Sequence, residues 1–445
     1  MFCLQRSRFI PTISIIVLTS LLSLSCATAP ESSTEAQEKK PHSSPSVISA
    51  SDTPTGFAGI GWESKARQVV EVRNAEELKK YASAGGYVVY VSGEIAITDK
   101  LPPSATGENA ALNALIAEKS EGKIQSWNEW KKLYALENTV TSEKKSNSDE
   151  LNAVHSALVK AWKDEITVKV ASDTVIIGLG GAVIKGGSLS VQGVANVAIR
   201  NVTIQDAFDP FPHHEANDGW NAEYDCISIV GSKNVWIDHC TFQDTISVGE
   251  EAFDHVREGD NSVEKWQTYD GLCDMKGSFA NVTVSSCHFK NHDKTMLVGS
   301  SDSEKFEGVR TLTLSGNYFE NCVQRLPMVR LTNVHIYNNY YDAAADSAYK
   351  SSYCIGARNE SRITAENNCF GSGIKNTVSG HASKQGSLYL SRNIDNSSKG
   401  AKEGQFIPLS SPAFDVPYQY NPIASENVAD FCKQSAGSDV LSVAR

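Results

Sequence analysis

Four carboxylates in two short segments of this sequence are spaced so that they could bind a cation. Glu223 and Asp225 lie in NAEYDCISI, and Asp270 and Asp274 lie in YDGLCDMKG. A shift of 47 residues sets Asp270 on Glu223 and Leu272 on Asp225, with Asp274 two places further on the same alternating face. Carboxylates this close repel one another unless something positive binds between them. Calcium accepts irregular oxygen ligation better than magnesium, so the pattern predicts a calcium site.

Three basic residues follow this acidic group along the chain. Lys294 lies in NHDKTMLVG, and Arg325 and Arg330 begin and end RLPMVR. The net charge of the chain is −11, which argues against a nucleic-acid partner. Cations gathered beside a calcium site nevertheless predict a local groove for a polymer of carboxylates, because the local field, and not the net charge, meets the ligand.

The elements that must position these residues are strands of a repeat. Segments such as NVWIDHCTFQD have apolar residues at the second and fourth places and an apolar or aromatic residue at the ninth. They begin at Asn196, Asn234, Asn281, Thr311, Asn333 and Arg362, and a related segment begins 22 residues before Asn196, at Thr174. A strand repeat with a minimum step of about twenty residues is typical of a stacked solenoid. The sequence therefore predicts an all-β fold, a right-handed, single-stranded parallel β-helix.

Two further residue types recur at fixed places in these segments. Asparagines lie at the bends of successive repeats and predict a stacked ladder that satisfies backbone groups; they are Asn317, Asn338, Asn339 and Asn368. Cysteines occupy matching places in adjacent repeats, Cys240 with Cys287 and Cys226 with Cys273. They predict stacked, inward-facing thiols, and a disulfide remains the alternative because neighbouring strands are close enough.

Residues 106–165 do not follow the strand pattern. Apolar residues recur there at spacings of three and four with charges between them, which predicts two or three inserted helices. We interpret Trp127, Trp130 and Tyr134 as the packing face of this insertion, and not as a platform for a sugar.

The amino terminus has the features of an export signal. Arg6 and Arg8 precede an apolar run from Ile10 to Leu24, and small residues lie before Cys26. Two outcomes stay open: lipidation of Cys26, as in a bacterial lipoprotein, or cleavage nearby by an ordinary signal peptidase. We expect a cell-surface lipoprotein, with a possible lipid anchor in a bacterial membrane, or a secreted protein.

The predicted organisation follows from these segments. Residues 1–26 are the signal, residues 27–52 have the composition of a flexible tether, and residues 53–445 form the β-helical domain with the helical insertion.

The motifs of this domain resemble the pectate lyase family of polysaccharide lyases. NVWIDHCTF resembles the family's signature, and DGWNAEYDCISI, YDGLCDMKGSFANVTVSSCHFKNHDKTMLVGSSDS and RLPMVRLTNVHIYNNYYD resemble the blocks that follow it. The likeness runs from about Gly56 to the C-terminal segment, apart from the helical insertion. The resemblance implies a parallel β-helix that cleaves polygalacturonate or low-methyl pectin by calcium-dependent β-elimination and releases 4,5-unsaturated oligogalacturonates.

The resemblance also implies roles for individual residues. Asp225, Asp270 and Asp274 hold Ca²⁺, with Glu223 at a further ligand position. Lys294 and Arg330 bind uronate carboxylates, and Arg325 is the catalytic base. Arginine is normally protonated, so this role needs neighbouring positive charge that favours the neutral form. Lysine gives up its proton more readily, which makes Lys294 the alternative base.

Two departures from the family pattern bear on substrate binding, because Met328 stands where the family often has arginine and Thr332 replaces a common glycine. Trp236, Asp238 and His239 belong to the signature and are expected to be structural. The alternatives to a pectate lyase are a pectin lyase acting on methylated chains and a non-catalytic surface binder of acidic glycans. We expect a monomer.

Overall fold

We describe a computed structural model of the chain at residues 47–104, 107–139, 149–215, 219–246, 255–256, 263–264 and 266–445. The predicted signal and most of the predicted tether lie outside these residues. Within them, no helix is both long and apolar enough to cross a membrane.

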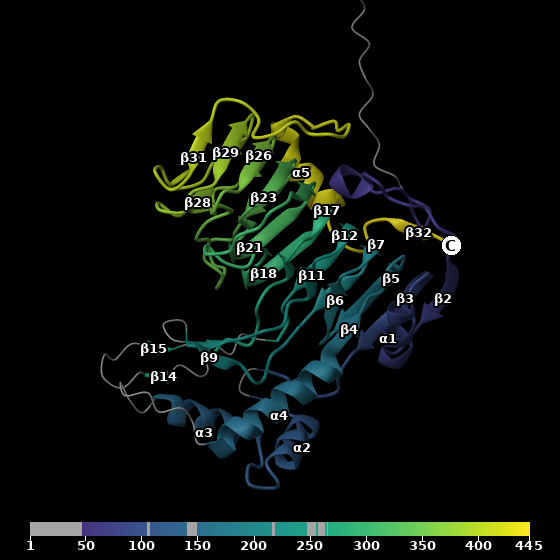
Figure 1. The fold of residues 1–445 in the computed structure, drawn as a ribbon, viewed down its shortest axis with the longest axis vertical. Helices are drawn as coiled ribbons and strands as arrows, with labels where there is room; N and C mark the ends of the chain where they lie inside the picture. Colours follow the sequence, from purple (N-terminus) through teal and green to yellow (C-terminus); the bar gives the residue numbers. More distant parts are fainter. Residues whose placement is uncertain are drawn as a thin grey trace, which may run out of the picture. The chain divides into compact units, whose positions relative to one another are not determined.

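The strands of the repeat stack in parallel and form the predicted β-helix (Figure 1). One series of paired strands comprises β2 (Gln68–Val72), β3 (Tyr87–Ala96), β5 (Val175–Lys185), β7 (Ala195–Arg200), β12 (Lys233–Asp238), β17 (Ala280–Ser285), β20 (Arg310–Ser315), β23 (Thr332–Tyr337), β26 (Arg362–Glu366), β29 (Ser387–Ser391) and β31 (Ile407–Leu409). A second series in the same sheet comprises β8 (Thr203–Gln205), β13 (Thr241–Gln243), β18 (His288–Lys294), β21 (Tyr318–Gln324), β24 (Tyr340–Asp342), β27 (Cys369–Phe370) and β30 (Ile394–Asp395).

A separate eight-stranded parallel sheet forms another side of the β-helix. It comprises β4 (Thr167–Lys169), β6 (Ser188–Gln192), β11 (Ile227–Val230), β16 (Cys273–Lys276), β19 (Leu297–Val298), β22 (Met328–Val329), β25 (Ile355–Ala357) and β28 (Val378–Gly380). Two short antiparallel pairs lie outside these sheets, β9 (His213–Glu215) with β10 (Gly219–Asn221) and β14 (His255–Val256) with β15 (Val263–Glu264).

The register of the six predicted repeats is confirmed. The residue at the second place of each segment lies opposite its counterpart in the next: Val197, Val235, Val282, Leu312, Val334 and Ile363. The 22-residue step to the Thr174 segment is wrong by one, because Val175 lies opposite Ala198. The alternation of the strand requires this shift. Ile176 and Ile199 both face the main core, whereas Val175 and Ala198 face away from it.

Asparagines form a hydrogen-bonded ladder at the bend between the first two series of strands. Asn317 donates to Asn339 Oδ1 at 2.9 Å, Asn339 donates to Asn368 Oδ1 at 3.0 Å, and Asn368 donates to Asn393 Oδ1 at 2.9 Å. The predicted ladder is therefore confirmed for three of its members. Asn338 lies outside it and instead accepts from the backbone N–H of Ile423 at 3.0 Å.

We expect Asn339→Ala to lower the free energy of unfolding by about 3 kcal/mol, because it leaves several buried partners unsatisfied at once. Asn339 Nδ2 also donates to the carbonyl oxygen of Leu314 at 3.0 Å. Urea unfolding followed by circular dichroism measures the change. Gln385→Ala is the control, since Gln385 makes an exposed hydrogen bond to Gly404; equal losses in the two variants would contradict the ladder's contribution.

The signature residues join neighbouring turns, as expected of a structural role. Arg200 donates to Asp238 Oδ2 from Nε at 3.0 Å, and Ser285 donates to Asp238 Oδ1 at 2.7 Å. Burial alone would raise the pKa of Asp238, but ion pairing with His239 and Arg200 holds it at about 2. The indole of Trp236 donates to Ser285 Oγ at 2.9 Å.

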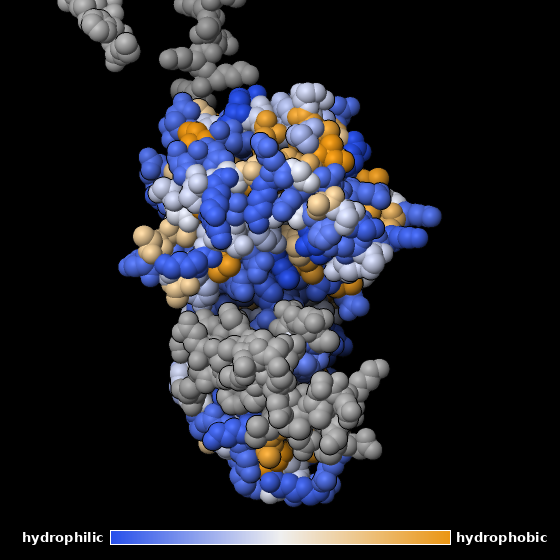
Figure 2. Space-filling model, turned by 90° about the vertical axis from the view of Figure 1, so that its left-hand side faces the viewer, coloured by the Kyte–Doolittle hydropathy of each residue, from blue (hydrophilic) through white to orange (hydrophobic). Residues whose placement is uncertain are grey.

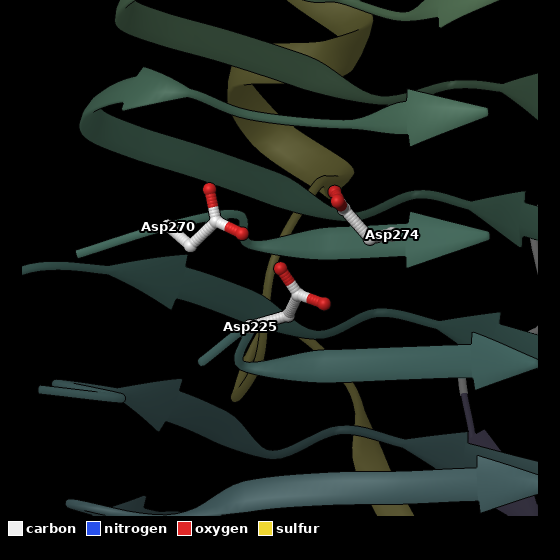
Figure 3. A group of neighbouring side chains, drawn as sticks. All are labelled: Asp225, Asp270 and Asp274. Carbon is white, nitrogen blue, oxygen red and sulfur yellow. The ribbon is translucent and has the colours of Figure 1, made fainter. Parts of the chain in front are cut away.

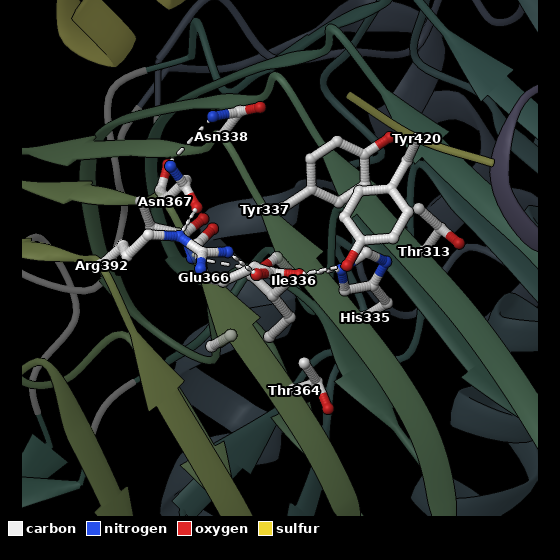
Figure 4. A network of polar contacts seen from close by, with 12 residues as sticks. Thr313, His335, Ile336, Tyr337, Asn338, Thr364, Glu366, Asn367, Arg392 and Tyr420 are labelled. Atoms are coloured by element: carbon white, nitrogen blue, oxygen red, sulfur yellow. Dashed lines mark hydrogen bonds and ion pairs between the residues drawn. The ribbon is translucent and has the colours of Figure 1, made fainter. Parts of the chain in front are cut away.

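The C-terminal segment is fastened to the outer face of the β-helix by a polar network (Figure 4). Glu366 on β26 accepts from the hydroxyl of Tyr420 at 2.6 Å, lies 3.1 Å from His335 Nε2 on β23, and is ion-paired with Arg392. The helix α5 (Ser425–Ser435) follows and covers β24 and β27. The chain ends in β32 (Ser442–Ala444), which pairs in parallel with β1 (Val47–Ser49).

This pairing corrects the predicted boundary of the tether. Val47–Ser49 were expected in a flexible segment, but they form a strand, and Ile48 is fully buried. Asp52 adds an ion pair to Arg200 at 2.8 Å. Burial of Ile48 in an apolar cluster stabilises β1. The polar composition of the preceding residues gave no indication of this strand.

The described residues of the predicted insertion form three helices, α2 (Ala110–Lys119), α3 (Trp127–Thr139) and α4 (Asp149–Ile166). Trp127, Trp130 and Tyr134 are buried in a second apolar core, which confirms their packing role. Near the start of the domain lie the short 3-10 helix at Gly56–Gly59 and α1 (Ala75–Ala84), which packs against β3 and β4.

The described surface is mainly polar on the face shown in Figure 2, where hydrophobic residues form small, separate groups. All eight cysteines in the described part of the chain are buried free thiols, including Cys240 and Cys287.

Candidate active site

Asp225, Asp270 and Asp274 come together at the amino-terminal ends of β11 and β16, two neighbouring strands in the middle of the eight-stranded sheet (Figure 3). One carboxylate oxygen of each lies within 4.8 Å of those of the others. Asp225 precedes β11, Asp270 precedes β16, and Asp274 lies on β16. Asp225 and Asp274 are buried, so water neither solvates nor screens their charges.

The strands that carry this group pair in a register one residue away from the predicted one. Ile227 on β11 lies opposite Cys273 on β16, a step of 46 residues, whereas β12 and β17 pair with a step of 47. The turn between β16 and β17 spans residues 277–279, and the corresponding turn between β11 and β12 spans only residues 231–232. The extra residue in the later turn accounts for the difference.

This register changes three predicted alignments. Gly271, and not Leu272, lies beside Asp225, whose Oδ1 accepts from the backbone N–H of Gly271 at 3.1 Å. With the same step of 46 residues, Asp270 lies one place beyond its predicted position opposite Glu223. The predicted match of Cys226 with Cys273 is also wrong by one place, since Cys273 lies opposite Ile227.

Burial and mutual repulsion perturb the acidic group. Burial, followed by the charges of Asp274 and Asp270, raises the pKa of Asp225 well above its usual value. Burial also raises the pKa of Asp274, an effect that Lys276 opposes. Lys276 Nζ lies 3.5 Å from Asp274 Oδ2, which accepts no hydrogen bond among the described residues. Two lysines lie close to the three carboxylates, Lys276 beside Asp274 and Lys294 beside Asp270. Three carboxylates outnumber these two positive charges, so the group can accept a cation.

Gly271 leaves the space in which the carboxylates meet. A Cβ at this position would lie 2.4 Å from Asp274 Oδ1 and 2.7 Å from Asp225 Oδ1. We expect Gly271→Ala to weaken Ca²⁺ binding at least about tenfold, because ligand oxygens must lie within a few tenths of an ångström of their coordinating positions. Titration calorimetry with CaCl₂ measures the affinity. Gly180→Ala is the control for a glycine substitution, because Gly180 is exposed and a Cβ there would make only an ordinary contact, 3.6 Å from Asp439 Oδ1. Unchanged affinity in Gly271→Ala would contradict the prediction.

Glu223 lies outside this group of three. Its side chain is 41% exposed, and Oε1 lies 3.5 Å from His213 Nδ1. Its backbone N–H donates to the buried Asp209 at 3.0 Å. The sequence prediction of a ligand position for Glu223 stays a prediction.

Lys294 on β18 reaches the acidic group directly. Its Nζ lies 3.0 Å from Asp270 Oδ1 and donates at 2.7 Å both to Asn221 Oδ1 and to Gln267 Oε1. Asn221 and Gln267 were missed by the sequence analysis. Each follows a tryptophan and precedes one of the aspartates by three or four residues, and that shared arrangement is the signal that could have found them.

Arg325 follows β21, which pairs with β18, at the bend before β22. Its backbone has a φ of 60°, in the left-handed region that non-glycine residues seldom adopt. Its Nε is buried and has no hydrogen-bond partner among the described residues. Burial raises the pKa of Asp274, and the positive charge of Arg325 is among the effects that oppose this rise, so the guanidinium lies within electrostatic reach of the acidic group.

Arg330 directly follows β22, and most of its guanidinium donates hydrogen bonds to other groups of the protein. Nε donates to Asp302 Oδ1 at 2.6 Å, and one terminal nitrogen donates to the carbonyl oxygen of Gly299 at 3.0 Å. Asp302 also pairs with Arg358. Met328 Sδ lies 3.9 Å from Arg330 and 3.5 Å from Arg358, so arginines of two turns surround it.

Comparison with known proteins places the chain in a family. Residues 134–441 match the family model described as pectate lyase. A curated pectate lyase from Bacillus subtilis (strain 168) is 36% identical over 232 residues, covering 51% of this chain and 54% of that protein. The match thus spans about half the length of that relative. The family match covers more than half of the chain, and the chain belongs to the pectate lyase family.

Solved structures agree on the fold. A variant of Bacillus subtilis pectate lyase shares 25% sequence identity with a TM-score of 0.69, covering 88% of this chain and 99% of that one. A pectate lyase bound to a hexasaccharide shares 27% identity with a TM-score of 0.67, covering 87% and 97%.

Proposed function

We propose that this protein is a calcium-dependent pectate lyase that cleaves polygalacturonate or low-methyl pectin by β-elimination. The single observation that carries the proposal is the contact between the buried acidic group and Lys294, with Arg325 in electrostatic reach. The family relationship and the hexasaccharide bound by a structural relative support a chain of sugars as the substrate.

Asp225, Asp270 and Asp274 fit a calcium ion. Such an ion requires hard oxygen ligands and space to bind. The group supplies three carboxylates, one buried oxygen that accepts no hydrogen bond from the described residues, and the space kept free by Gly271. When bound, Ca²⁺ supplies Lewis acidity that stabilises the negative charge developing on the uronate carboxylate.

The basic residues do the rest of the chemistry in this proposal. Lys294 and Arg330 bind uronate carboxylates and lower the energy of the enolate-like charge next to carbon five. Neutral Arg325 accepts the proton from carbon five, the electron pair forms the double bond between carbons four and five, and the bond from carbon four to the glycosidic oxygen breaks. The departing oxygen takes a proton from solvent, and the new non-reducing end is a 4,5-unsaturated uronate.

A spectrophotometric assay tests the proposal. Full-length protein is incubated with polygalacturonate at alkaline pH, with CaCl₂ and then with a chelator, and the ultraviolet absorbance of the unsaturated product is followed. A rise that the chelator abolishes is expected. A rise that survives the chelator would indicate a calcium-free pectin lyase, and new reducing ends without absorbance would indicate hydrolysis. Binding without either signal would favour a glycan-binding protein.

We also propose that the protein acts outside the cytoplasm as a monomer. The export signal that the sequence predicts at the amino terminus supports this location. Fractionation of the native host, with labelling by a fatty-acid analogue and a Cys26→Ser control, distinguishes a lipid-anchored form from a secreted one.

A further inference from the structure

Two uncharged side chains hold Lys294 in place. Its ammonium has three protons, and three oxygen atoms surround it: Asn221 Oδ1 and Gln267 Oε1, both at 2.7 Å, and Asp270 Oδ1 at 3.0 Å. The side chain is only 10% exposed. Amide oxygens accept hydrogen bonds without cancelling the charge of the donor, so Asn221 and Gln267 orient the ammonium and leave its charge for another partner.

Asn221 and Gln267 are themselves fixed by neighbouring tryptophans. The backbone N–H of Gln267 donates to the carbonyl oxygen of Trp220 at 2.9 Å, and Trp220 and Trp266 form a parallel bridge. Both indoles are buried, with ring centroids 5.0 Å apart. The residue that follows each tryptophan is therefore presented on the same side, toward Lys294.

The helical insertion packs directly on this pair of tryptophans. Tyr134 on α3 lies 5.3 Å from the ring of Trp220. Trp162 on α4 donates to the carbonyl oxygen of Phe208 at 2.9 Å, and Trp127 on α3 donates to that of Pro210 at 2.9 Å. The insertion therefore shares one apolar core with aromatic residues of two later segments, which are Phe208, Phe211, Trp220, Tyr224, Trp266 and Tyr269.

We propose that Asn221 and Gln267 are positioning residues for Lys294, and that the helical insertion serves catalysis by fixing them through Trp220 and Trp266. The inference rests on the proposed function, since it assigns a role toward the uronate carboxylate that Lys294 binds. When Asp270 binds a cation, its carboxylate is less available to Lys294. Asn221 and Gln267 still accept two protons of the ammonium, and the third proton is then directed to the substrate carboxylate.

A double-mutant cycle tests whether the amides act through Lys294. Gln267→Met removes the acceptor at nearly constant volume, and Asn221→Ala removes the other. We expect each to lower kcat/KM on polygalacturonate about tenfold or more, the size of one lost hydrogen bond to a charged group. In the Lys294→Ala background, the same substitutions should change kcat/KM less than twofold, because their partner is gone. An equal loss in both backgrounds would indicate a merely structural role and overturn the proposal.

Two further measurements make the test decisive. Gln243→Ala is the matched control, because this part-buried amide bonds to Gln205 and not to a charged group; we expect it to leave kcat/KM within twofold. If Lys294→Ala is too slow to assay, calorimetric binding of trigalacturonate in an Arg325→Ala background replaces kcat/KM in the same cycle. Inactive wild-type protein would refute the proposed function, whereas active wild-type protein with unaffected Gln267→Met and Asn221→Ala would refute only this inference.

Discussion

Arg325→Lys is expected to lower kcat on polygalacturonate by a factor on the order of 10³, while KM changes little. The contribution of a positioned general base is about 10²–10⁴-fold. Lysine keeps the positive charge, so substrate attraction is preserved, but its shorter reach and single nitrogen do not replace Nε. Arg325 has features of such a group: a buried Nε without a hydrogen-bond partner in the described region, and a left-handed backbone conformation held by the bend before β22.

The competing assignment gives a different pattern. If Lys294 were the base, Lys294→Ala would abolish exchange of the carbon-five proton with solvent deuterium, and Arg325→Lys would retain near-normal turnover. The contacts argue against that pattern, because three oxygen atoms surround the Lys294 nitrogen and leave it no open side that faces the substrate proton. Arg392→Lys serves as the control for the substitution, since Arg392 pairs with Glu366 on the outer face.

The fold could be predicted from the sequence because the repeated segments can be aligned with one another. Six segments share one pattern, so their register could be read by superposition, and the structure pairs Val235 with Val197 and Val282 as predicted. The pattern failed where turn length varies. One extra residue at 277–279 shifted the predicted register of β16 by one place, which set Leu272 where Gly271 lies.

The supporting residues of the site were less accessible to prediction. A cluster of charged residues at matching positions of a repeat can be recognised from the sequence alone, as was the case for Asp225, Asp270 and Asp274. Asn221 and Gln267 are common polar residues, and their role depends on a distant strand bringing Lys294 to them. The helices of the insertion were predicted from the periodicity of apolar residues. Their contact with Trp220 could not be predicted in this way, because it joins segments that are far apart in the sequence.

Asp225→Asn is expected to have opposite effects on stability with and without calcium. In the presence of a chelator, it should raise the free energy of unfolding at pH 7 by about 1–2 kcal/mol, because it removes a buried carboxylate that Asp270 and Asp274 repel. Its amide oxygen can still accept from Gly271. With Ca²⁺ at a hundred times the dissociation constant, wild-type protein should gain about 2.7 kcal/mol and the variant almost none. Activity should fall at least about 10³-fold, as it should when the wild type is treated with the chelator.

The pH dependence of the metal-free protein follows from the same group. The folded protein raises the pKa of Asp225 and Asp274 above the unfolded values, so between those values the folded state binds more protons than the unfolded state. Its stability therefore falls as pH rises through that window, and Asp225→Asn should flatten the decline. Calcium competes with these protons, so its stabilising effect should grow as pH rises. Chemical unfolding across pH, with and without CaCl₂, measures both slopes, and Asp415→Asn at an exposed site is the control. A calcium effect independent of pH would mean that the ion binds elsewhere, because an ion held by these carboxylates must compete with their protons.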